Sequence, residues 1–159
     1  MKVGILTFHS AMNYGAVLQA HALQTKIKSF GVECDIIDYR CEAFRKVYSP
    51  FYMSEKSVRG LLSMLLYFPI RLLKYRKFND FKKINLKLSN EAYDKSNCSK
   101  LNGRYDLIVV GSDQVWNPEL TDFDPTYFLA CVNDKTLKAS YAASLGTTTL
   151  TDPQKEMFD

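Results

Sequence analysis

The spacing of apolar residues predicts a strand, a helix and a second strand at the start of the chain. Lys2 to Phe8 is a short, almost wholly apolar run, which is typical of a buried strand. Apolar residues then recur at steps of 4, 3, 4 and 3, so they share one face of a helix that begins at Gly15 and stops at Gly31. They are Ala16, Ala20, Leu23, Ile27 and Phe30. "VECDIIDY" follows as a second strand and completes a βαβ unit, whose strands are parallel.

The same pattern predicts helices and two more strands in the rest of the chain. Residues 41–55 are irregular, residues 57–83 form one or two helices broken at Pro69, and "SNEAYDKSNCSKLNGR" is a polar connection. "YDLIVVG" is the clearest strand, because its four consecutive apolar residues suit a strand covered on both faces. "TLKASYAAS" is the next. The predicted fold class is therefore α/β, a Rossmann-like parallel sheet flanked by helices, with "GILTF", "CDIID", "LIVVG" and "KASYAA" as adjacent central strands.

The last residues carry the signals of a helix start. Thr151 and Gln154 have the spacing of a capping box, and Pro153 suits a first helical turn. Only five residues follow Gln154, which is too few for a stable helix. We expect residues 1–159 to be the N-terminal domain of a longer protein.

Composition indicates one globular domain without a metal or disulfide framework. The chain has 159 residues, 47% of them apolar, which is enough for one core. Its four cysteines form no CxxC pair and no grouping with histidine, so zinc and disulfides are not expected and a reducing cytoplasm fits best. The first residues lack the features of a signal peptide. The longest apolar stretch is interrupted by Pro69 and Arg71, so no membrane span is expected.

Positive charge is concentrated in one segment. Residues 56–87 hold nine basic side chains and one acid, Asp80, for a balance of +8 against −4 in the remainder. No DNA- or RNA-binding motif accompanies them, so nucleic acid is not an expected partner. The leucines among them suit an interfacial helix on an anionic membrane surface. The alternative is a solvated basic face over a core-packing stripe.

Three polar segments follow predicted strands, where open α/β sheets place their ligand crevice. In "HSAMNYG", Asn13 can cap a helix and Gly15 allows close approach, so the helix N–H groups could hold a phosphate or carboxylate. The alternative is a plain strand-to-helix turn, with His9 as a structural histidine. "SYAASLG" is best explained by close packing around small residues. We expect "HSAMNYG" and the second segment, "GSDQVWNP", to line one crevice.

"GSDQVWNP" holds the side chains best suited to sugar chemistry. Asp113 could act as a base or bind a sugar hydroxyl, and Trp116 could stack on a sugar ring. In the structural alternative, Ser112 or Asp113 caps a turn and Trp116 fills the edge of the core.

Taken together, "GILTFHSAMNYGAVLQAHALQ", "DLIVVGSDQVWNP" and "KASYAASLG" resemble, in that order, the polysaccharide pyruvyl transferase family. The resemblance covers the N-terminal half of the family's usual length. It implies one domain of a GT-B-like two-domain transferase that moves pyruvate from phosphoenolpyruvate onto a sugar or lipid-linked glycan as a ketal, in exopolysaccharide or cell-surface glycan biosynthesis. It implies no cofactor besides that donor. The substrate-binding residues that match are Asn13, Tyr14, Gly15, Gln19, Ser112, Gln114, Trp116 and Asn117, and the catalytic candidates are Asp113 and His9.

Two other function classes stay open. A GT-B-like glycosyltransferase that uses a nucleotide sugar would share the architecture, and a non-catalytic glycan-binding domain would share the crevice. Because the family's phosphoenolpyruvate-binding residues lie in the second domain, we expect residues 1–159 alone to be inactive. We also expect an exposed domain interface through which the chain could form a homo-oligomer, and a cytoplasmic location that allows peripheral contact with the membrane.

Overall fold

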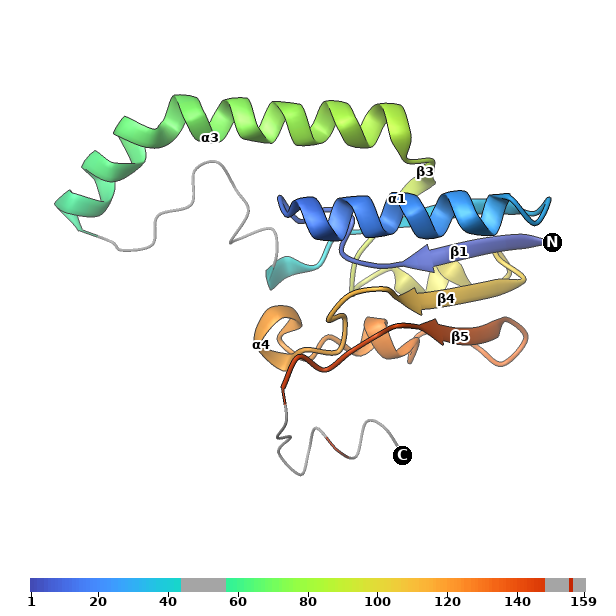
Figure 1. Ribbon diagram of the computed structural model, residues 1–159. Coiled ribbons are helices and arrows are strands. Elements are labelled where there is room, and N and C mark those ends of the chain that lie inside the picture. The colour runs from blue at the N-terminus through green and yellow to red at the C-terminus, as the bar shows by residue number, and fades with distance from the viewer. Residues whose placement is uncertain (44–56, 148–154, 156–159) are drawn as a thin grey trace.

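The computed structural model describes residues 1–43, 57–147 and 155, and these contain a five-stranded, wholly parallel sheet (Figure 1). The strand order is β3-β2-β1-β4-β5. The strands are β1 (Lys2–Leu6), β2 (Glu33–Tyr39), β3 (Leu88–Tyr93), β4 (Leu107–Gly111) and β5 (Leu137–Tyr141). This confirms the α/β, Rossmann-like prediction, and the four predicted strands are indeed neighbours.

Helices cover both faces of the sheet. On one face, α1 (Tyr14–Lys28) and the end of α3 (Val58–Asn85) pack over Val3, Ile5 and Val109. The other face, with Leu6 and Ile108, is covered by the connections that hold η1 (Cys98–Leu101), α4 (Pro118–Thr121) and η2 (Pro125–Phe128). Alternate residues of β1 and β4 enter opposite clusters because side chains alternate along a strand. Each of these strands therefore contributes apolar side chains to the hydrophobic clusters on both faces of the sheet.

Two predictions about the strands were wrong. Residues 89–93, assigned to a polar connection, form most of β3, which pairs in parallel with β2. The sequence LSNEAY hides this strand because β3 is an edge strand of the described sheet, and such a strand needs no long apolar run. β5 is also at an edge rather than central, and all five of its residues are exposed.

The helices also differ from their predicted limits. α3 runs through Pro69 without a break, although it bends in its N-terminal part, where proline lacks an N–H donor (Figure 1). In α1, Ala16 and Ala20 are buried as predicted, but Phe30 lies beyond the helix and is 68% exposed. The predicted capping box at Thr151 and residues 44–55 of the irregular region lie outside the described residues.

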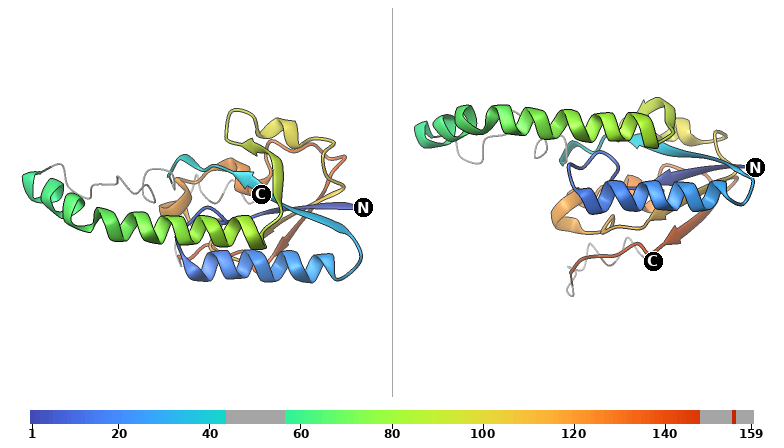
Figure 2. Two further views of the ribbon diagram at one scale, coloured as in Figure 1. Left: turned by 90° about the horizontal axis from the view of Figure 1, so that it is seen from above. Right: turned by 45° about the horizontal axis from the view of Figure 1, so that its top comes forward.

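Contacts at the C-terminal end of α3 hold it to the domain. Phe78 is buried, its ring 4.6 Å from that of Tyr14, and His21 Nδ1 lies 3.1 Å from the Asn85 carbonyl oxygen. The N-terminal part of α3 extends beyond the sheet in both views of Figure 2. In the part of the chain that the structure describes, no helix combines the length and the apolar content needed to cross a lipid bilayer.

Candidate active-site groove

The carboxyl ends of β1 and β4 meet at the point where the strand order reverses. From β1 the chain continues to β2 on one side, and from β4 it continues to β5 on the other. Val3 to Leu6 pair in parallel with Leu107 to Val110, so the segments that follow the two strands leave the same edge of the sheet. This confirms that "HSAMNYG" and "GSDQVWNP" share one edge. Open α/β sheets bind their ligands outside this kind of edge.

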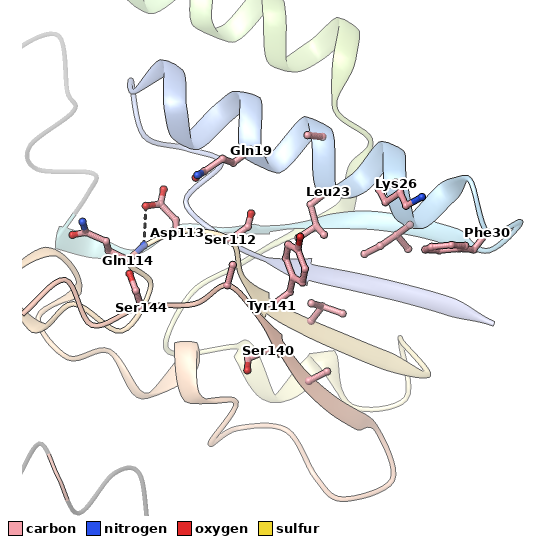
Figure 3. Close-up of a pocket in the computed structure, with 15 residues that line it drawn as sticks. Gln19, Leu23, Lys26, Phe30, Ser112, Asp113, Gln114, Ser140, Tyr141 and Ser144 are labelled. Atoms are coloured by element: carbon pink, nitrogen blue, oxygen red, sulfur yellow. Dashed lines mark hydrogen bonds between the residues drawn. The ribbon is translucent and has the colours of Figure 1, made fainter.

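A groove of about 990 Å³ lies between α1 and the end of the β4–β5 pair (Figure 3). Gln19 and Asp113 lie at one end of it, and Lys26 and Phe30 lie at the other. Its remaining lining residues come from α1, β4, β5 and the turns after those strands: Ala22, Leu23, Ile27, Val109, Ser112, Gln114, Ala139, Ser140, Tyr141, Ala142 and Ser144. The groove is thus apolar along its length and polar where the strands end.

The backbone at the polar end adopts conformations that side chains rarely take. Gly111 has φ 124°, and a Cβ there would overlap the Tyr141 carbonyl oxygen, so this position requires glycine. Ser112 and Ala142 have φ values of 59° and 48° although both carry a Cβ. The Ser112 amide donates to the Tyr141 carbonyl oxygen at 2.6 Å, which holds the two strand ends together. Strain of this kind is often found at functional sites.

Ser112 also carries a buried hydroxyl that the fold does not use. Its Oγ has no hydrogen-bond partner among the described residues. Leaving a buried hydroxyl unpaired costs roughly 1–3 kcal/mol, so native folds seldom do so without a reason. Thr7 Oγ1 is likewise buried and unpaired among those residues, one position after the last β1 residue that pairs with β4. Two unsatisfied hydroxyls therefore lie at the end of neighbouring strands.

Asp113 presents one carboxylate oxygen to the groove. Its Oδ1 accepts a hydrogen bond from the Gln114 amide at 2.8 Å, and its carbonyl oxygen accepts one from the Ser144 amide at 3.1 Å. These bonds fix the side chain and the loop. No donor among the described residues reaches the other oxygen, Oδ2, and the side chain is only half-buried. Asp113 can therefore accept a proton or a hydrogen bond from a molecule in the groove.

The rest of "GSDQVWNP" is engaged within the fold. Trp116 Nε1 donates to the Tyr127 carbonyl oxygen at 3.0 Å, and the indole stacks on Phe128 at 15° with 5.9 Å between centroids. Asn117 caps α4 by accepting from the Glu119 amide at 3.0 Å, and its Nδ2 donates to Gln114 Oε1 at 2.9 Å. These contacts favour the structural interpretation of Trp116 and Asn117, and a sugar-stacking role for Trp116 stays a prediction.

Of the substrate-binding candidates before and within α1, Gln19 lines the groove, and Asn13, Tyr14 and Gly15 do not. The Asn13 side chain accepts from the amides of Gly15, at 2.8 Å, and Ala16, at 3.4 Å. It thereby occupies N–H groups that were predicted to hold an anion. The Tyr14 ring lies against Phe78 of α3. A Cβ at Gly15 would lie 3.2 Å from Asn13 Oδ1, so the close approach there is to its own capping residue.

Comparison with known families identifies the family of the chain. Residues 13–158 match the family model described as polysaccharide pyruvyl transferase. The chain belongs to the polysaccharide pyruvyl transferase family. The family is one of transferases, and the match covers every segment of the groove described above. No match was found among curated proteins or among solved structures.

His9 precedes the residues that match the pyruvyl transferase family, and it does not line the groove. It is buried, with Nε2 3.1 Å from Asp38 Oδ1 on β2 and Nδ1 3.3 Å from the Thr7 carbonyl oxygen. Arg40 also contacts Asp38, at 3.1 Å. The hydrogen bond from His9 lowers the pKa of Asp38, with a smaller contribution from Arg40, and outweighs the opposing effect of burial. The structure thus places His9 in a separate ion-pair cluster.

Sequence reasoning missed Tyr141 as a groove residue. "SYAASLG" was assigned to close packing, and this holds for Ala143, which a Cβ on Gly111 would touch. Tyr141 instead is 58% exposed and lines the groove. The position of Tyr141 at the end of a predicted strand was the sequence feature that could have identified it as a groove residue. Within the described ranges, no three His, Cys, Asp or Glu side chains form a group that could hold a metal ion.

Proposed function

We propose that the groove is one wall of an active site that transfers pyruvate from phosphoenolpyruvate to a sugar of an exopolysaccharide or cell-surface glycan. Membership of the pyruvyl transferase family supports this reaction. The observation that carries the assignment to this groove is the unpaired, buried hydroxyl of Ser112 beside the open carboxylate oxygen of Asp113. The acceptor is a free sugar or a lipid-linked glycan with two neighbouring hydroxyl groups.

The reaction defines what the groove must do. Two sugar oxygens each form a bond to the central carbon of phosphoenolpyruvate, and the bond from that carbon to the phosphate oxygen breaks. The methylene carbon takes up one proton and becomes a methyl group. The two sugar hydroxyls release two protons, so the second leaves with inorganic phosphate. The reaction balances without a redox step or a further cofactor, and it requires a general acid and a general base.

In this proposal Asp113 is the base that deprotonates a sugar hydroxyl, through the oxygen that the Gln114 amide leaves open. Ser112 pairs its hydroxyl with the sugar, and Gln19 contributes an amide from the opposite side of the groove mouth (Figure 3). An amide and a hydroxyl next to a carboxylate are typical of sites that bind sugar hydroxyls. The amide and the hydroxyl can each donate or accept a hydrogen bond, and the carboxylate accepts one.

The donor's negative charge must be matched from another part of the enzyme. Among the described residues that line the groove, Lys26 alone is a cation, and it lies at the end away from Asp113 (Figure 3). The five exposed residues of β5 support a further element beside this sheet, because parallel strands are normally covered on both faces. Both features suit a GT-B-like arrangement, in which a second domain closes the cleft and supplies the phosphate-binding cations.

The test is phosphate release from phosphoenolpyruvate by the native gene product, with galactose- and mannosamine-containing acceptors. We expect release only with an acceptor, and a fall of about 10²–10⁴-fold for Asp113→Asn, the range for loss of a general base. Asp122→Asn is the matched control, because Asp122 is an exposed carboxylate that does not line the groove. We expect it to keep nearly full activity.

Two results would overturn the proposal. If a nucleotide sugar stabilises the native protein against heat and phosphoenolpyruvate does not, the protein is a glycosyltransferase. If only glycan binds and no phosphate is released, it is a glycan-binding protein.

Residues 1–159 alone should fold but release no phosphate, because one wall cannot hold both reactants in register. Turnover by this chain would place all catalytic groups within it.

A further inference from the structure

The N-terminal half of α3 exposes a row of large apolar side chains. Leu62 is 63% exposed, Leu65 60% and Leu66 71%, and the same holds for Leu61, Ile70 and Leu73, each at least 46% exposed. This part of the helix lies beyond the sheet in both views of Figure 2. An apolar surface of this kind on a projecting helix marks an interaction site more often than chance exposure.

α3 has two apolar faces that point in different directions. Phe78 and Phe81 face the domain, since Phe78 is buried in the hydrophobic cluster that α1 and β1 share and Phe81 packs against that cluster. Leu62 and Phe78 are sixteen positions apart, as are Leu65 and Phe81, which at 100° per residue is about 160° around the helix axis. Leu62 and Leu65 therefore point away from the side of α3 that Phe78 and Phe81 turn to the domain. Among the described residues, the fold leaves Leu62 and Leu65 exposed.

Basic side chains continue the leucine face toward the C-terminal end of α3. Lys83 is eighteen positions after Leu65, which is about five full turns, and Lys77 is eleven after Leu66, about 20° from the same direction. Both are exposed. Asp80, eighteen positions after Leu62, lies on the same face and is the one acid in residues 56–87, against nine basic residues. A partner that covers this face thus meets an apolar surface followed by positive charge.

We propose that α3 is a membrane-docking helix that lies on an anionic lipid surface, with the leucine row in the interface and the basic residues against the headgroups. Amphipathic helices with apolar side chains on one face and Lys or Arg beside them bind membranes in this way. The charge complementarity decides the occupant, because α3 carries seven basic residues and one acid, a balance of +6 that disfavours a second copy of the same helix and favours an anionic surface. The inference does not depend on the proposed reaction.

Binding to lipid vesicles tests the proposal on the chain as it is. Vesicles of phosphatidylcholine alone are compared with vesicles that also contain phosphatidylglycerol, at about 0.1 M and about 1 M salt, between which the Debye length falls from about 10 Å to about 3 Å. We expect at least about tenfold stronger sedimentation with the anionic vesicles at the lower salt, and loss of that preference at the higher salt.

Paired variants separate the two parts of the face. Leu62→Ser with Leu65→Ser should abolish binding to the anionic vesicles, while Leu18→Ser, an exposed leucine of α1, should not weaken it. Lys77→Gln with Lys83→Gln should remove the anionic preference, while Lys95→Gln with Lys100→Gln, the same change of charge on other exposed lysines, should keep it. Far-ultraviolet circular dichroism checks that each variant is folded.

Three outcomes would overturn the proposal. Equal sedimentation with both kinds of vesicle would mean that charge does not select the partner. Equal effects of the α3 variants and their controls would mean that the helix is not the contact. A dimer in analytical ultracentrifugation that Leu62→Ser with Leu65→Ser dissociates, without vesicle binding by the parent chain, would identify a second copy as the occupant.

Discussion

Replacing Ser112 by alanine should make the protein more stable and a poorer binder of its acceptor. The Ser112 hydroxyl is buried and has no partner among the described residues, so in the ligand-free protein it contributes only a desolvation cost. That cost is roughly 1–3 kcal/mol for a hydroxyl. The backbone contributes little to the difference, because serine and alanine both carry a Cβ at the positive φ of 59°.

We therefore expect Ser112→Ala to raise the free energy of unfolding by about 1–2 kcal/mol. For a chain of this size, each kcal/mol corresponds to a rise in Tm of about 2–4 °C. If the hydroxyl pairs with an acceptor sugar, its loss should cost about 1 kcal/mol of binding free energy, which is about a fivefold rise in Kd. Stability and affinity would thus change in opposite directions.

Urea unfolding of residues 1–159 measures the first effect, and calorimetric titration of the native gene product with acceptor measures the second. Ser99→Ala is the control, because Ser99 is exposed in η1, and we expect it to change stability by less than about 0.5 kcal/mol. A loss of more than about 1 kcal/mol in Ser112→Ala, at an unchanged urea dependence, would refute the reasoning, since the hydroxyl would then have a partner inside the fold.

Three further predictions concern the frame around the groove. Phe78→Ala should lower the free energy of unfolding in urea by about 3–5 kcal/mol because the ring is buried, whereas Leu62→Ala, at an exposed position, should change it by less than about 0.5 kcal/mol; similar losses would contradict the two-faced description of α3. The lowered pKa of Asp38 contributes stability that is complete above the ordinary carboxyl value of 3.8 and is lost as pH falls below it. Asp38→Asn should therefore flatten the loss of stability between about pH 6 and pH 2, measured by urea unfolding, and an unchanged slope would argue against this ion pair. Gly111→Ala should cost at least about 2 kcal/mol, because a Cβ at φ 124° overlaps the neighbouring strand, and amide hydrogen exchange at the end of β5 should become faster; native exchange rates would contradict the clash.

The pattern of apolar residues along the sequence was enough to identify the strands that are buried on both faces. β1, β2 and β4 lie inside the sheet, where each strand is covered on both faces, so their apolar runs are continuous in the sequence. The start of α1 could also be predicted, because the Asn13 side chain caps the helix through amides only two and three residues later. These features depend on neighbours in sequence or on burial alone.

Features that depend on residues far away in the sequence could not be predicted from it. Gln24 is buried in α1, where a polar residue would not be predicted, because its amide donates to the carbonyl oxygens of Cys34 and Lys87 and accepts from the Lys87 amide. Those partners come together only when β2 and β3 are in place. β3 itself was missed because an edge strand can stay polar on its exposed side.

The sequence alone determined that "HSAMNYG" and "GSDQVWNP" lie at one edge of a parallel sheet, since both follow strands that run in the same direction. Only the tertiary structure decided which of their side chains line the groove. Tyr14 packs on α3 and Trp116 donates into the core, because a side chain's direction follows from backbone torsions and from the surface it packs on. Ser112 and Asp113 line the groove because the chain turns at a positive φ immediately after β4, and β5 holds that turn through a backbone hydrogen bond from 29 residues away. The residues around Ser112 in the sequence give no indication that Tyr141 is its partner.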